Sequence, residues 1–380
     1  MRLLAPRSAV PRLSRRAFLS GVAVVASGGL AGCGGHRFAP TARPDGRLED
    51  RLNVFSWGDY DDPDNITAFR EDHKVSVQFD AFASNEELIA KLATARGTSG
   101  YDIVVPTGDF VPMMVANGLL ARLDHALLPN LANVDKPYRD RAWDPQNAYV
   151  VCKDWGTTGF VYDTTKITRG LTSWQDFLDV ATGPASGSTS VLDDPFEFVS
   201  IYLAAYGHDL NTEDPAVLAD AESYLVDTLA RHIRNFSSQP SQNIIQGDFA
   251  LMQAYNGDVR LAIQEAETDK WRFVFPTPTA NLWMDTWAIA TGCEHPDIAH
   301  KFIDTMLDPE VGYREMDYIG YPTGLTGQRE LAMQRQVDLP DLIFPPDDVL
   351  ARLTTRTLNS SQEALVRILD RARTQAGAGS

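Results

Sequence analysis

Cysteine is scarce in this chain, and the metal-binding and catalytic motifs that sequence alone can reveal are missing. The three cysteines are Cys33, Cys152 and Cys293, with no Cys-x-x-Cys spacing, and the seven histidines are scattered without a His-Glu-x-x-His pattern. There is also no Gly-x-Ser-x-Gly, Walker lysine loop or dinucleotide-binding glycine fingerprint. The sequence therefore predicts no metal and no cofactor, and it leaves open whether Cys152 and Cys293 form one bridge or two free thiols.

Positively charged residues are also few compared with acidic ones. The chain carries 34 Lys and Arg against 51 Asp and Glu, a formal net charge of −17. Residues 1–32 hold five arginines and no acidic residue, so the remaining 348 residues have a net charge of −22. This acidity argues against nucleic acid as a partner and would concentrate a cationic small molecule, although a need for solubility explains it about equally well.

Long hydrophobic runs are missing after the N-terminal segment. Within that segment, a twin arginine in Ser14–Leu19 precedes an apolar stretch too short to span a membrane, and Leu30–Cys33 follows it. The pattern predicts a Tat-type lipoprotein signal over residues 1–32 and acylation of the Cys33 thiol. The alternative is an ordinary secretory signal with a chance cysteine. We expect a protein on the extracytoplasmic face of the cell membrane or in the periplasm, lipid-anchored, with residues 33–50 as a tether.

Strand-like and helix-like segments alternate from Arg51 onward, which predicts an α/β protein of two domains with a parallel sheet. In the first region we expect strands at 52–55, 75–79 and 102–105, and helices at 63–71, 86–95 and up to Asn117. In the second we expect strands at 191–192, 250–255, 272–275 and 286–290, and helices at 196–205, 215–232, 297–307 and 309–318. Ser84 with Glu87 predicts a capping box, and Ser173 predicts a helix cap.

Five short segments together combine aromatic rings with carboxylates: 55–60, 193–197, 255–258, 283–285 and 320–322. Several directly follow a predicted strand, the place where open α/β sheets bind ligands. Aromatic faces between carboxylates suit a flexible organic cation such as a polyamine, because ammonium groups need charge-assisted hydrogen bonds and methylenes need apolar walls. Each segment alone has a structural explanation, as a core aromatic, a helix cap or a turn, so only the set indicates a site.

Four segments carry a family resemblance: Trp57–Tyr60, Tyr101–Thr107, Trp155–Gly159 and Trp283–Asp285. With these segments in family order, the chain resembles the spermidine/putrescine-binding proteins that feed bacterial ABC importers. The resemblance implies a two-lobed type II periplasmic-binding-protein fold, each lobe a mixed sheet flanked by helices, with ligand in the cleft between lobes and hinge closure as the motion. The expected lobes are 51–155 plus 286–331 and 156–285 plus 332–375.

The resemblance also implies the site residues. The walls for a methylene chain would be Trp57, Tyr60, Tyr255, Trp283 and Tyr321. The ligands for amines would be Asp59, Asp194, Glu197, Asp258 and Asp285, with Thr107 and Asn359 as further polar groups. The chain departs from the family pattern at Tyr255, where tryptophan is usual, and at Asp109, where spermidine binders can carry an aromatic residue.

This set predicts a binding protein without catalytic residues. We expect a monomer that delivers a polyamine to an ABC permease with ATPase subunits and touches the membrane only through its lipid. Spermidine should bind roughly tenfold tighter than putrescine, because Asp194 adds a negative group and Trp283 a broad ring face. The alternatives are a glycan-processing hydrolase with paired carboxylates and a same-fold receptor for another solute. An amino-acid receptor would normally need an arginine, and the five segments contain none.

Overall fold

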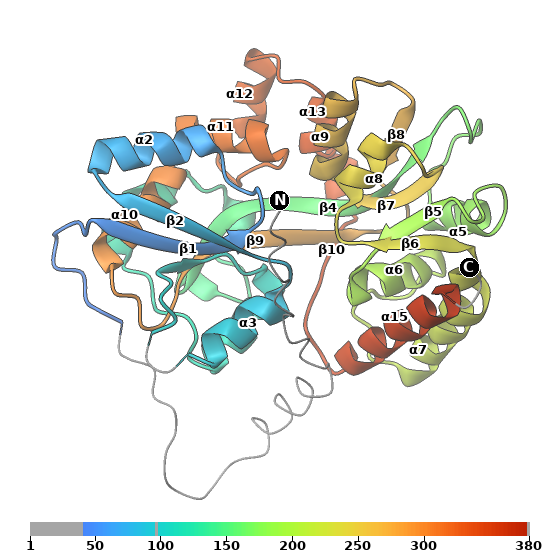
Figure 1. The fold of residues 1–380 in the computed structure, drawn as a ribbon, viewed down its shortest axis with the longest axis horizontal. Helices are drawn as coiled ribbons and strands as arrows, with labels where there is room; N and C mark the ends of the chain where they lie inside the picture. The colour runs from blue at the N-terminus through green and yellow to red at the C-terminus, as the bar shows by residue number, and fades with distance from the viewer. Residues whose placement is uncertain (1–40, 96–97, 378–380) are drawn as a thin grey trace, which may run out of the picture. The chain divides into compact units, whose positions relative to one another are not determined.

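The computed structural model describes residues 41–95 and 98–377. The expected signal segment, Cys33 and the first part of the tether lie outside these residues. Within them, ten strands form a sheet in the order β2-β1-β3-β9-β4-β7-β5-β6, with β10 paired to β9 and β8 to β4 (Figure 1). The strands are β1 Arg51–Trp57, β2 Ser76–Phe82, β3 Ile103–Val104, β4 Val150–Asp163, β5 Thr189–Leu192, β6 Ile233–Ser237, β7 Leu251–Tyr255, β8 Trp271–Val274, β9 Asn281–Ile289 and β10 Thr354–Thr355.

The sheet consists of two parallel halves joined by two antiparallel strands. In one half β1 runs parallel to β2 and β3, and in the other β5 runs parallel to β6 and β7. Strand β9 is antiparallel to β3, β4 is antiparallel to β7, and β4 and β9 are antiparallel to each other. The parallel sheet expected from the alternation of elements therefore exists only within each half, and the sheet as a whole is mixed, as the resemblance implied.

Helices lie on both sides of the sheet. In Figure 1, α8 and α9 lie above β6 and β7, whereas α6, α7 and α15 lie below them. The helices are α2 Pro63–His73, α3 Asn85–Ala93, α4 Val111–Ala116, α5 Trp174–Thr182, α6 Pro195–Ala205, α7 Pro215–Glu222, α8 Pro240–Gln246, α9 Asn256–Ala266, α10 Pro296–Met306, α11 Pro309–Ile319, α12 Gln328–Gln334, α13 Pro340–Ile343, α14 Asp347–Leu350 and α15 Gln362–Gly377. None of the helices in this part of the chain is both long and apolar enough to cross a membrane.

Aspartate followed by proline begins four helices. The caps are Asp62, Asp194, Asp214 and Asp308, and each carboxylate accepts a backbone N–H of the first helical turn.

The two helix caps expected at serines are both present, but one is incomplete. The cap at Ser173 is confirmed, with a full capping box through Asp176. Ser84 caps α3, yet the Glu87 carboxylate accepts from Ala83 N rather than from Ser84 N, so the expected box is half formed.

Several elements differ from the sequence-based expectations, and β6, α8, α9 and α12 to α15 were not expected at all. Strand β9 begins at Asn281 rather than at residue 286, so the segment 283–285 lies within a strand. Strand β4, which spans 14 residues, was not expected as a strand. The helix expected at 215–232 is helical in three pieces, because a π-helical stretch, Ser223–Leu229, follows α7 before a final 3-10 turn at Ala230–His232.

The apolar core is divided among separate clusters. The largest surrounds β5, α5, α6 and α15 and includes Phe160, Trp174 and Phe198. Another packs β1, β3 and β9 against α10 and contains both Cys152 and Cys293, which are buried free thiols. Of the two alternatives for these cysteines, the structure therefore has the free thiols. The expected lobe boundaries stay a prediction.

Candidate functional site

Both halves of the sheet contribute to a cleft of about 730 Å³. Trp57 and Phe82, at the ends of β1 and β2, line it from one half. Leu192, Ser237 and Tyr255, at the ends of β5, β6 and β7, line it from the other. These are carboxyl ends of parallel strands, where open α/β sheets carry ligand sites.

Eleven of the twelve expected site residues lie on this lining: Trp57, Asp59, Tyr60, Thr107, Asp194, Glu197, Tyr255, Asp258, Trp283, Asp285 and Tyr321. Asn359 is not among them. Its side chain donates to Asn211 O at 2.7 Å and accepts from Ser361 N at 3.0 Å, so it holds the turn before α15. The structure thus brings together all but one of these residues, and their role as ligands stays a prediction.

Aromatic rings form one wall of the cleft. The Trp283 ring makes edge contacts with Tyr321 and Tyr255, at centroid distances of 4.9 and 5.8 Å. Two glycines make room for this wall, since a Cβ on Gly156 would come within 2.3 Å of the Trp283 ring and one on Gly257 within 2.5 Å of Tyr321. The rings are therefore held in place by close backbone approach.

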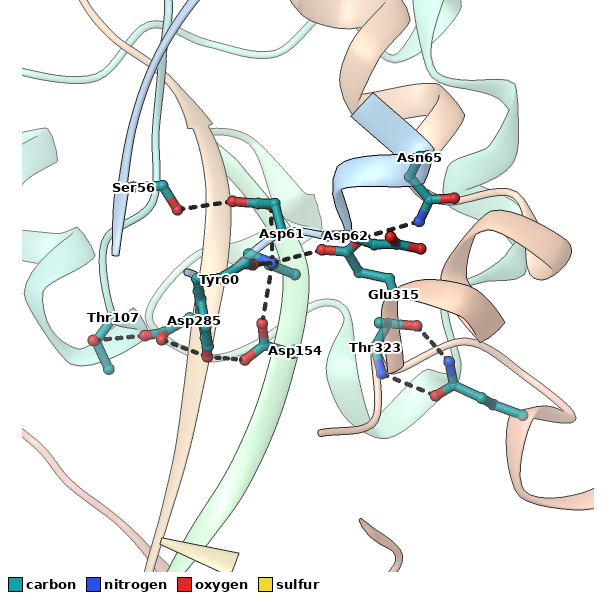
Figure 2. A network of polar contacts seen from close by, with 12 residues as sticks. Ser56, Tyr60, Asp61, Asp62, Asn65, Thr107, Asp154, Asp285, Glu315 and Thr323 are labelled. Carbon is teal, nitrogen blue, oxygen red and sulfur yellow. Dashed lines mark hydrogen bonds and ion pairs between the residues drawn. The ribbon is translucent and has the colours of Figure 1, made fainter. Parts of the chain in front are cut away.

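Two carboxylates share the hydroxyl of Tyr60 (Figure 2). This oxygen lies 2.5 Å from Asp154 Oδ1 and 3.1 Å from Asp285 Oδ2, and its single hydrogen can be donated to one of them at a time. Asp285 Oδ1 also accepts from Thr107 Oγ1 at 2.7 Å. Burial raises the pKa of Asp285 to about 6 and that of Asp154 to about 7. The surroundings of the Tyr60 hydroxyl thus hold more hydrogen-bond acceptors than donors.

A buried lysine lies behind Tyr60. A β-bulge at Lys153 interrupts the pairing of β4 with β9, and Asp154 stands opposite Asp285 in the register. Lys153 Nζ lies 3.2 Å from Asp61, 3.3 Å from Glu315 and 3.5 Å from Asp154, and it donates to Tyr60 O at 2.7 Å. Burial would lower the pKa of Lys153, but these carboxylates outweigh burial and raise it. The cluster of Lys153, Asp61, Asp154 and Glu315 therefore fixes the backbone and ring of Tyr60 from behind.

Two further carboxylates face the cleft from the other half of the sheet. Glu197, in α6, accepts from Asn281 Nδ2 at 2.7 Å, and Asp258, in α9, accepts from the Tyr321 hydroxyl at 3.0 Å. Burial raises the pKa of Glu197 to about 7 and that of Asp258 to about 6. Among the described residues, no group of three or more His, Cys, Asp or Glu could hold a metal ion. Glu197 and Asp258 thus add further hydrogen-bond acceptors to the lining of the cleft.

Sequence reasoning missed two cationic residues of the cleft, Arg356 and Arg141. Arg356 is the one that pairs with carboxylates of the lining. It follows β10 and lies 3.0 Å from Asp109 Oδ2 through Nε and 3.8 Å from Asp194 Oδ2 through a terminal nitrogen. Arg356 and Asp109 both belong to the lining, as does Arg141. No local signal marked Arg356, because it lies outside the five aromatic and acidic segments.

The comparisons with known proteins agree on one family. Residues 65–340 match the model of the family described as bacterial extracellular solute-binding protein. Spermidine/putrescine-binding periplasmic protein 1 of Haemophilus influenzae is 30% identical over 82% of this chain and 85% of its own length. The putrescine-binding periplasmic protein PotF of Escherichia coli is 29% identical over 86% of this chain and 90% of its own. The solved TpPotD lipoprotein of Treponema pallidum superposes with a TM-score of 0.76 at 27% identity, covering 86% of this chain and 100% of that one. The expected two-lobed binding-protein fold is confirmed by this likeness.

Proposed function

The chain belongs to the bacterial extracellular solute-binding proteins, and we propose that it is a receptor that binds a polyamine in this cleft and delivers it to an ABC permease with ATPase subunits. As a member of that family it is a binding protein and not an enzyme, in agreement with the sequence analysis, and the hydrolase alternative is set aside. The names of the relatives, which specify spermidine and putrescine, support the ligand class.

One observation carries the proposal: two buried carboxylates, a half-buried third and an aromatic wall face the same cleft. Asp285, Glu197 and Asp258 supply the charge, and Trp283 and Tyr321 supply the ring faces. Burying unpaired carboxylates is costly, and an ammonium ion offsets that cost because it supplies both charge and N–H donors. The methylenes between two ammonium groups would pack on the rings. A ligand that touches both halves would hold the closed form of the cleft.

The lipid anchor and the Tat-type export signal belong to the same proposal. Their support is the pattern of residues 14–33, together with the similarity to TpPotD of Treponema pallidum, which is itself named a lipoprotein. An anchored receptor would stay beside its permease after release of the ligand.

Calorimetric titration of the purified protein tests the ligand class. The panel is putrescine, cadaverine and spermidine, with γ-aminobutyrate and glucose as controls of similar size without two ammonium groups. We expect saturable one-to-one binding of the amines and no binding of the controls. If no amine binds, or if a control binds as tightly as the best amine, the proposal is wrong.

A further inference from the structure

Arg356 occupies one end of the cleft as a cation that belongs to the protein. Its guanidinium carbon lies 5.4 Å from the centroid of the Phe110 ring and 5.0 Å from that of Phe196, so an aromatic ring from each half of the structure flanks it. Its Nη2 donates to Gln362 Oε1 at 3.0 Å, and its Nη1 is the nitrogen that lies near Asp194. Only 12% of the side chain is exposed. These contacts place the guanidinium between the two rings, with Gln362 as its hydrogen-bond acceptor.

Two carboxylates of the lining are engaged by this guanidinium. Asp109 is the closer one, at 3.0 Å, and its side chain is 3% exposed. Asp194 lies 3.8 Å away through Oδ2, while its Oδ1 caps α6 by accepting from Glu197 N at 2.9 Å. Burial alone would lower the pKa of Arg356, but Asp109 and Asp194 outweigh it and raise the pKa, so the charge is retained. Both carboxylates therefore already face a cation.

We infer that Arg356 limits the ligand to a diamine, because it takes the place that the third ammonium of a triamine would need. The inference rests on the proposed polyamine function. With Asp109 and Asp194 engaged, the buried Glu197 and Asp285 and the half-buried Asp258 remain as carboxylates for the ligand. Two ammonium groups can be served by these three. The other acidic residues of the lining are exposed to solvent: Asp59, Glu86, Glu87 and Asp193. A third ammonium would approach a buried guanidinium of like charge or would have to displace it from two ion pairs and two ring faces.

This inference replaces the spermidine preference expected from the sequence. That expectation treated Asp194 as a free negative group, whereas the structure pairs it with Arg356 and uses it as a helix cap. The same pairing argues against an amino-acid ligand. A ligand carboxylate at Arg356 would also face Asp109 and Asp194, both of which would repel it.

Calorimetry on the whole protein at pH 8 tests the inference, with Arg356→Gln as the main variant. For the wild type we expect the better of putrescine and cadaverine to bind at least tenfold tighter than spermidine. In Arg356→Gln, spermidine should gain at least tenfold relative to that diamine, because Asp194 and Asp109 become free to bind the third ammonium. Arg356→Lys keeps a cation and should keep the diamine preference.

The matched control is Arg141→Gln. Arg141 also lies on the lining, but its guanidinium donates to Pro137 O and Thr355 Oγ1, and it forms no ion pair with the residues the structure describes. This variant changes the net charge equally and should leave the ratio of spermidine to diamine affinity unchanged. If Arg356→Gln is unstable because Asp109 loses its partner, Arg356→Gln/Asp109→Asn removes both charges and still frees Asp194.

The outcomes separate this inference from the proposed function. Spermidine binding as tightly as the diamines in the wild type, or an unchanged ratio in Arg356→Gln, overturns the inference and leaves the polyamine receptor standing. If no amine binds the wild type, the proposed function fails. Tight binding of γ-aminobutyrate that Arg356→Gln abolishes would make Arg356 a carboxylate ligand and overturn both.

Discussion

Replacing Asp285 by asparagine removes one negative charge from the cleft and keeps the shape of the side chain. The amide oxygen can still accept from Thr107 Oγ1, which lies 2.7 Å from Asp285 Oδ1. The amide nitrogen can donate to the Tyr60 hydroxyl, which then gives its own hydrogen to Asp154, 2.5 Å away. The fold should therefore persist, and the effect of Asp285→Asn should appear in ligand binding.

The expected loss of affinity follows from burial. Asp285 is only 6% exposed, so solvent screens its charge little. An ammonium that loses one ionised partner in a desolvated cleft costs about 2–4 kcal/mol, or roughly 30- to 1000-fold in affinity. Asp220→Asn, on the exposed face of α7, changes the net charge equally at a distance from the lining and serves as the control.

Calorimetry with putrescine at pH 8 measures this loss, because Asp285 is then ionised in the wild type. A dissociation constant for Asp285→Asn within threefold of the wild-type value, or equal to that of Asp220→Asn, would refute the reasoning and place Asp285 outside the binding site. Asparagine also relieves the cost of burying a charge, so the ligand-free variant should melt at or above the wild-type temperature at this pH.

Three further predictions concern pH, export and the buried lysine. Burial raises the pKa of Asp285 to about 6 in the folded protein, above its unfolded value, so its stabilising contribution is present below about pH 4 and lost as pH rises through about 6. The melting-temperature difference between Asp285→Asn and wild type should therefore grow from pH 5 to pH 8. A constant difference would contradict this. Cys33→Ala should move the protein from the membrane fraction to soluble or unprocessed material, whereas unchanged tight attachment would place the anchor elsewhere. Lys153→Met strands Asp61, Asp154 and Glu315 without their cation and should cost about 3–5 kcal/mol in urea unfolding at pH 8. The loss should be smaller at pH 5.5, because burial raises the pKa of Asp61 and Asp154 to about 7.

Local sequence signals located most elements but could not reveal β4. Asp-Pro pairs and Ser173 mark helix starts through contacts made within a few residues, so sequence contains the whole signal. Strand β4 is buried at all 14 positions, yet it carries Lys153, Asp154 and glycines that break any strand-like pattern. The buried charge of Lys153 is tolerated because Asp61 and Glu315, which are distant in sequence, form ion pairs with it. No local sequence pattern indicates these pairs.

The site was predictable where its residues cluster and not where they pair at a distance. Short segments such as 57–60 and 283–285 place aromatic and acidic groups together, and the structure brings them to one lining. Asp109 was noted only as a departure from the family pattern, and Arg356 lies alone after β10. Only the folded chain shows that these two are an ion pair. Asn359 was assigned by position in a family, and its amide is used by the turn before α15 instead.

The single hydrogen of the Tyr60 hydroxyl has a consequence for chemical discrimination. When the hydroxyl gives this hydrogen to Asp154, Asp285 Oδ2, which lies on the lining of the cleft, receives no hydrogen from Tyr60. A primary ammonium ion arrives with three hydrogens and can supply one, whereas a trimethylammonium ion of the same charge arrives with none. A diamine and its permethylated analogue would have equal charge and length, yet only the diamine supplies the hydrogen-bond donors that the carboxylates lack. The receptor would therefore distinguish its ligand from quaternary ammonium solutes by the number of N–H donors on the ligand rather than by its charge.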